Sequence, residues 1–143
     1  MGGGEDDVRA QLDKRPEGFR SSVEAHGPEY ACEEFLDFRN GPGSWEGYSD
    51  RTRDNFLNRT QGHIANLKAN MKNQTPASAL ATITVPTLAI KSEEATSFDG
   101  RMVEIVAEAM PNGKLITVPD TAHMLPRTHP DLVAEIVLKH LAG

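Results

Sequence analysis

The sequence has 143 residues, of which 38% are hydrophobic and 6% aromatic, and it carries a net charge of −6. That length fits one domain or part of one, with a lean core or with a partner surface that completes it. The acidic balance argues against a nucleic-acid partner, because binding the phosphate backbone needs a basic face.

The cysteine count and the hydropathy pattern bear on the compartment. The single cysteine, Cys32, excludes an internal disulfide and fits a reducing environment. The sequence has no apolar run long enough to cross a membrane and no signal-peptide core. We therefore predict a cytoplasmic protein with no membrane partner.

The first part of the chain, residues 1–82, is predicted to be a helical region with a disordered, glycine-rich start. A loose amphipathic helix is predicted over residues 5–20. A clearer apolar stripe predicts a helix over residues 29–39, which ends at Asn40-Gly41-Pro42-Gly43. Apolar residues at three- and four-residue steps predict one further helix from Ser49 or Asp50 to about Lys72.

The second part, residues 83–143, has a different pattern. Apolar, β-branched runs predict strands over residues 85–90 and 115–118. Helices are predicted over residues 101–110, after a loop from Lys91 to Gly100, and over residues 128–141. This order of strand, helix, strand and helix predicts a right-handed βαβ unit with parallel strands, and hence an α/β fold.

Two parallel strands do not make a stable sheet by themselves, because parallel sheets have several strands and are covered on both faces. The remaining strands would come from another chain or from a longer fold. We therefore predict that the chain expressed alone is oligomeric or aggregation-prone, as a homo-oligomer or with a complementing chain.

His123 lies on the loop that follows the second predicted strand. Pro119 and Asp120 precede it and Pro126 follows it, so the loop is expected to be stiff. Loops at the carboxyl ends of parallel strands are where ligands and catalytic groups gather in open α/β sheets. His123 is therefore the leading candidate for a functional residue, and the competing interpretation is a loop histidine with a backbone hydrogen bond.

The second part of the chain resembles the carboxyl-terminal end of an α/β-hydrolase. The resemblance is carried by Val85-Pro86-Thr87-Leu88-Ala89-Ile90, by the helix that ends Ala109-Met110-Pro111-Asn112, and by Thr121-Ala122-His123-Met124-Leu125-Pro126. The segment Asp37-Phe38-Arg39-Asn40-Gly41-Pro42-Gly43-Ser44-Trp45 resembles a lid pattern of one bacterial subgroup. The resemblance implies a helical lid over residues 1–82 and a partial hydrolase core over residues 83–143. It also implies that His123 is the general base for hydrolysis of an ester, or a related bond, in a small apolar substrate, without a cofactor.

The chain departs from that family at two positions that matter for catalysis. It contains no Gly-x-Ser-x-Gly turn, and Gly43-Ser44-Trp45-Glu46-Gly47 has the wrong spacing. The serine nucleophile would therefore come from residues outside this sequence. Where the family often has Gly-x-x-Asp, this chain has Ser92-Glu93-Glu94-Ala95. Glu93 is the first candidate for the acid that orients His123, Glu94 the second and Asp99 the third.

Three residues are candidates for contact with the substrate: Trp45, Tyr48 and Met124. A competing interpretation of Trp45 and Tyr48 is that they are local packing anchors between two helices. The other histidines show no spacing that would indicate a zinc site. The alternative to a hydrolase is a catalytically inactive relic that acts as an oligomerisation or protein-interaction module.

Overall fold

The structure is a computed structural model that describes residues 17–72 and 75–142. The chain divides into two compact units, Met1–Gln74 and Thr75–Gly143. The boundary predicted after residue 82 thus falls after residue 74. The predicted disordered start and most of the helix predicted over residues 5–20 lie outside the described residues.

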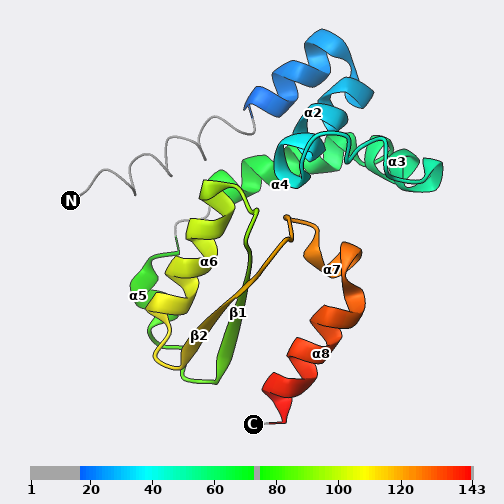
Figure 1. Ribbon diagram of the computed structural model, residues 1–143. Helices are drawn as coiled ribbons and strands as arrows, with labels where there is room; N and C mark the ends of the chain where they lie inside the picture. The colour runs from blue at the N-terminus through cyan, green and yellow to red at the C-terminus, as the bar shows by residue number, and fades with distance from the viewer. Residues whose placement is uncertain (1–16, 73–74, 143) are drawn as a thin grey trace. The chain divides into compact units, whose positions relative to one another are not determined.

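The first unit is helical in the part that is described (Figure 1). Residues 17–26 are helical, and α2 (Pro28–Asn40), α3 (Asp50–Leu57) and α4 (Thr60–Lys72) follow. The predicted helix over residues 29–39 is confirmed by α2. Gly27 precedes it with φ 89°, and Pro28 stands at its start, where the missing amide N–H costs nothing.

The single helix predicted from Ser49 to Lys72 is wrong, because the chain breaks at Asn58 and Arg59. The amide of Arg59 donates to Phe56 O, a bond of the tighter 3₁₀ type. The Thr60 hydroxyl donates to Leu57 O at 2.9 Å. A threonine that offers the backbone this alternative partner is a physical reason for the helix to stop there.

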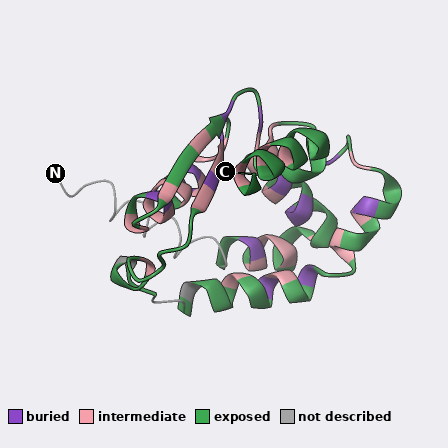
Figure 2. Ribbon diagram, turned by 90° about the horizontal axis from the view of Figure 1, so that it is seen from below, coloured by how far each residue is buried: buried purple, intermediate pink, exposed green. Residues whose placement is uncertain are grey.

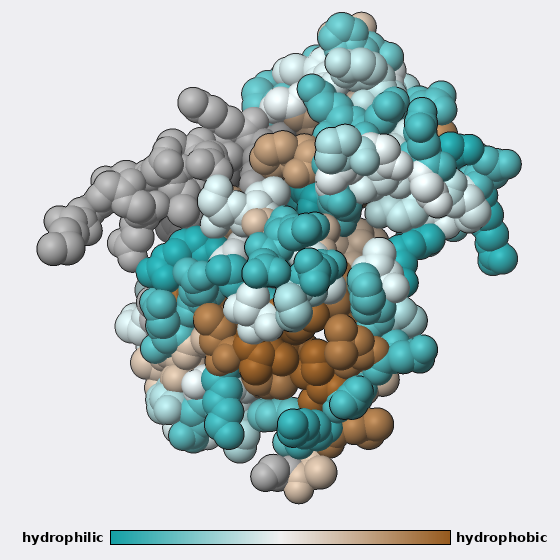
Figure 3. Space-filling view, viewed as in Figure 1, coloured by the Kyte–Doolittle hydropathy of each residue, from teal (hydrophilic) through white to brown (hydrophobic). Residues whose placement is uncertain are grey.

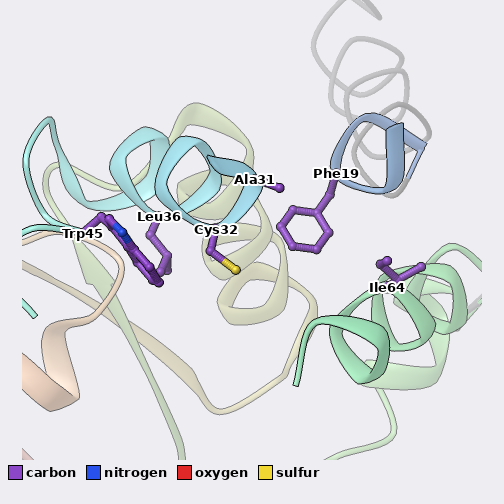
Figure 4. Packing of buried hydrophobic residues seen from close by; sticks show 6 residues of the cluster. All are labelled: Phe19, Ala31, Cys32, Leu36, Trp45 and Ile64. Carbon is purple, nitrogen blue, oxygen red and sulfur yellow. The ribbon is translucent and has the colours of Figure 1, made fainter. Parts of the chain in front are cut away.

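The core of the first unit lies between the 17–26 helix, α2, the loop after α2 and α4. Figure 4 shows its six buried side chains: Phe19, Ala31, Cys32, Leu36, Trp45 and Ile64. The loop is tied to α2 by Asp37, whose carboxylate accepts the amide N–H groups of Gly43 and Trp45, both at 2.8 Å. These two bonds give the Asp37–Trp45 segment a structural role, because they hold the Trp45 ring in the core.

The second unit is a mixed helix and strand structure built on two parallel strands. Its elements are α5 (Ala77–Leu80), β1 (Thr87–Ser92), α6 (Ser97–Ala109), β2 (Gly113–Val118), α7 (Leu125–Thr128) and α8 (Pro130–Leu141). β1 and β2 pair in parallel from Thr87↔Gly113 to Ser92↔Val118, with α6 between them in sequence. The parallel pair is thus confirmed, and the mixed helix and strand content is compatible with the predicted α/β class.

Element boundaries in the second unit differ from the prediction for local reasons. β1 begins at Thr87, because Pro86 has no amide N–H and the first ladder bond runs from Thr87 N to Asn112 O. The helix predicted over residues 128–141 is two helices, and His129 between them has φ −134° and ψ 58°. That conformation follows from Pro130, since a proline disfavours helical backbone in the residue before it.

β2 begins at Gly113, a position where only glycine fits. A Cβ at Gly113 would lie 2.2 Å from Ala107 O, inside van der Waals contact with the backbone of α6. The strand therefore passes directly under the last turn of α6. This close approach fixes where β2 starts relative to the helix.

The second unit leaves much apolar surface exposed. None of the residues of α8 is buried (Figure 2). Leu138 and Leu141 are 66% and 74% exposed, and Leu115 of β2 is also exposed. Figure 3 shows an apolar patch on the part of the second unit that holds the two strands and α8. Exposed apolar patches of this kind are typical of interaction surfaces.

Candidate functional site

His123 lies on the short loop between β2 and α7. Asp120 turns the chain with φ 52°, a left-handed conformation that aspartate tolerates better than most residues. The Thr121 hydroxyl donates to Val118 O at 2.8 Å and is buried. These features place His123 five residues after the carboxyl end of β2.

The acidic residue that faces His123 is Asp99. Its Oδ2 lies 3.9 Å from His123 Nδ1, and the two side chains are 13% and 36% exposed. Asp99 stands in the first turn of α6, which begins at Ser97. The pair thus joins the start of the helix after β1 to the loop after β2.

Thr96 holds the Asp99 side chain in place. The Thr96 hydroxyl donates to Asp99 Oδ2 at 2.8 Å, and Thr96 Oγ1 accepts the amide N–H of Asp99 at 3.2 Å. Thr96 is therefore both the cap of α6 and a positioning group for the carboxylate. The positive end of the α6 dipole also favours a negative charge at Asp99.

This arrangement has the parts of a histidine base and its orienting acid. A carboxylate at Nδ1 favours the tautomer in which Nε2 can accept a proton. The Nδ1 to Oδ2 distance is roughly an ångström longer than a hydrogen bond. Such bonds are often long before substrate binds and shorten in the complex.

Glu93 and Glu94, the two acids ranked first from the sequence, form hydrogen bonds with residues of the loop that carries His123 or of the strand end before it. The amide of Glu93 donates to Val118 O at 3.0 Å, and Glu93 Oε2 accepts the amide N–H of Asp120 at 3.1 Å. The amide of Glu94 donates to Thr121 O at 2.9 Å. These three bonds tie the loop after β1 to the His123 loop. The role of either glutamate as the orienting acid stays a prediction, and the geometry favours Asp99.

A pocket of about 370 Å³ lies beside the Asp99–His123 pair. Its walls are mainly apolar side chains from β1, α6, α7 and α8: Ile90, Met102, Val103, Leu125 and Val133. Ser92, at the carboxyl end of β1, is buried and places a hydroxyl-bearing residue in the same lining. No role was predicted for Ser92, although its place at the strand end was a usable signal.

The predicted substrate-contacting residues fall in different places. Trp45 is 3% exposed in the core of the first unit, and the Tyr48 ring lies 5.9 Å from the Phe56 ring. These contacts are those of packing anchors, the competing interpretation. Met124 is the residue before α7, and its carbonyl accepts the amides of Arg127 and Thr128. Substrate contact by any of the three stays a prediction.

Within residues 17–72 and 75–142, no three His, Cys, Asp or Glu side chains gather in a way that could hold a metal ion. Across the same residues, every helix is too short or too polar to span a bilayer.

Comparison with known proteins adds no relative. No family model matches this chain, and neither a curated protein nor a solved structure is similar to it. The hydrolase interpretation therefore rests on the sequence motifs and on the site geometry.

Proposed function

We propose that this chain supplies the histidine and the orienting acid of an α/β-hydrolase-type site, acting on an ester or a related bond in a small apolar substrate. The observation that carries the proposal is the Asp99–His123 pair beside an apolar pocket at the carboxyl ends of two parallel strands. The acid in this proposal is Asp99, which replaces Glu93 and Glu94 because it faces His123.

In the proposed reaction, Asp99 accepts a hydrogen bond from His123 Nδ1–H. His123 Nε2 then takes the proton of an attacking hydroxyl, and the imidazolium returns it to the leaving alkoxide. In the complete site the hydroxyl belongs to a serine outside this sequence. In the chain alone, water is the attacking group, and the rate is correspondingly low because no covalent intermediate forms.

The test is hydrolysis of p-nitrophenyl butyrate by the purified chain. We expect a slow rate above buffer that His123→Ala abolishes and that the control His129→Ala leaves unchanged. Asp99→Asn should lower the rate by about tenfold or more, as expected for loss of a general-base partner. Glu93→Gln should not. A rate that His123→Ala leaves intact would sink the proposal.

Ser92 needs its own control, because it lines the same pocket. If Ser92→Ala removed the rate as completely as His123→Ala does, the nucleophile would lie within this chain and the external serine would be wrong. A Gly-x-Ser-x-Gly turn encoded in phase ahead of this sequence would support the external serine directly.

A second candidate function is an oligomerisation or interaction module. The exposed apolar side chains of α8 and β2 favour it, since a monomer rarely leaves such a surface uncovered. This function needs no catalytic residue, so loss of His123 would leave assembly unchanged. The measurement that checks it is the oligomeric state of the chain in sedimentation.

A further inference from the structure

The helical unit contains a pocket of its own, of about 350 Å³. Its walls are made by the rings of Phe19, Phe35 and Phe56 together with Leu36 and Cys32. Figure 4 shows the Phe19 ring and the Cys32 thiol extending into the interior from two different helices. A pocket of this size and lining falls within the range of small-molecule sites.

The polar groups deep in this pocket are uncharged, and one of them, His63 Nε2, is buried without a hydrogen-bond partner among residues 17–72 and 75–142. The Thr60 hydroxyl donates to Leu57 O, and burial raises the pKa of the Cys32 thiol, so the thiol stays protonated near neutral pH. The His63 ring packs edge-on against Phe19 and Phe35, with centroids 4.9 and 4.8 Å away. Burial, with a smaller effect from the Arg39 charge, lowers the pKa of His63, so its imidazole is neutral and adds no charge.

Besides the buried His63 Nε2, two polar side chains near the opening of the pocket are available to a ligand. Arg59 and Asn66 line it and are exposed, which places them at its mouth. Neither side chain has a hydrogen-bond or ion-pair partner among residues 17–72 and 75–142. The pocket therefore combines a deep aromatic wall with one guanidinium and one amide at the opening.

We propose that this pocket binds a small amphipathic carboxylate, with its apolar body against the three phenylalanine rings and its carboxylate on Arg59 and Asn66. A guanidinium matches a carboxylate in both charge and shape. The chain carries a net charge of −6, so general attraction does not bring an anion to it, and the contact with Arg59 decides the preference. This site is separate from the Asp99–His123 pocket and does not depend on the function proposed there.

The test is calorimetric titration of the full chain with hydrocinnamate and with hydrocinnamyl alcohol, which share the aromatic body and differ in the charged group. We expect the carboxylate to bind more tightly than the alcohol. Arg59→Gln should weaken the carboxylate by about tenfold and leave the alcohol unchanged, as loss of a charge-assisted hydrogen bond predicts. Arg51→Gln is the matched control, because it removes an exposed arginine of the same unit that does not line the pocket.

A second variant blocks the pocket without touching Arg59. Gly62 lines the pocket, and a Cβ there would meet nothing within 4 Å. The Gly62→Leu variant should therefore fold, and its side chain should occupy part of the pocket. It should abolish binding of both ligands while circular dichroism shows the helical content retained. Equal weakening by Arg51→Gln, equal binding of acid and alcohol, or binding that survives Gly62→Leu would each overturn the proposal. Failure of both the acid and the alcohol to bind would also overturn it.

Discussion

A carboxylate orients a histidine only if its own position is fixed, and Asp99 meets that condition through Thr96. The Thr96 hydroxyl donates to the same oxygen, Oδ2, that faces His123 Nδ1. Glu93 is also fixed, but by the amide of Asp120, so its carboxylate serves the loop. At the scale of single residues, the choice between the acids depends on which partner each oxygen already has.

The sequence could place His123 on the loop after β2, but it could not show that Asp99 is the acid that faces it. The ranking used distance along the chain from the strand end, which favours Glu93. In the structure α6 begins at Ser97, four residues before the predicted Arg101. This earlier start places Asp99 in the first turn of α6, where it faces His123. A threonine followed three residues later by an aspartate, Thr96 and Asp99, is a known helix-start pattern and was the missed signal.

His63 gives a prediction for pH dependence. Burial lowers its pKa in the folded protein below the value of about 6.5 expected in the unfolded chain. The unfolded state therefore binds the proton first as the pH falls, and the free energy of unfolding decreases below about pH 6.5. His63→Phe should remove this part of the slope in urea titrations at several pH values. The exposed His26→Phe is the control, and the same loss of slope there would contradict the assignment.

At the scale of elements, the Thr96 cap of α6 contributes to the stability of the fold and also positions the Asp99 carboxylate. Replacing Thr96 by alanine removes the acceptor of the Asp99 amide and the donor to its carboxylate. We expect Thr96→Ala to lower the free energy of unfolding by about 1 kcal/mol, the usual cost of a lost helix cap. Denaturant unfolding measures this. Ser97→Ala, an exposed neighbour in the same turn, should change stability by less, and a loss as large as that of Thr96→Ala would rule out the capping explanation.

Helices and strands were predictable where a periodic pattern acts alone, as for α2, β1 and β2. Their ends were not, because single side chains set them, through a hydrogen bond or through the backbone restriction of a proline. The break at Asn58 depends on the Thr60 hydroxyl, and the division of the last helix depends on Pro130. The extent of α6 depends on the Thr96 cap. Each of these local effects outweighs the weak preference of one residue for helix or coil.

At the scale of the whole molecule, the exposed face of α8 predicts association. Leu138 and Leu141 are the most exposed large apolar residues of that helix. We expect the wild-type chain to sediment as an oligomer at micromolar concentration and the double variant Leu138→Lys/Leu141→Lys to shift toward monomer, because charge opposes burial of that surface. Lys139→Leu serves as a control that adds apolar surface. A wild-type chain that is a compact monomer would contradict the prediction.

The bonds between the two loops at the carboxyl ends of β1 and β2 bear on how the site moves. The amides of Glu93, Glu94 and Asp120 each reach across from one loop to the other. Neither loop can open without breaking bonds of its neighbour, so these three amides should exchange with deuterium at one shared rate in NMR measurements. Three distinct rates would show that the loops open separately. A shared rate would mean that the lifetime of the His123 position is set by a concerted opening of both loops, and any ligand that must enter there waits for the same event.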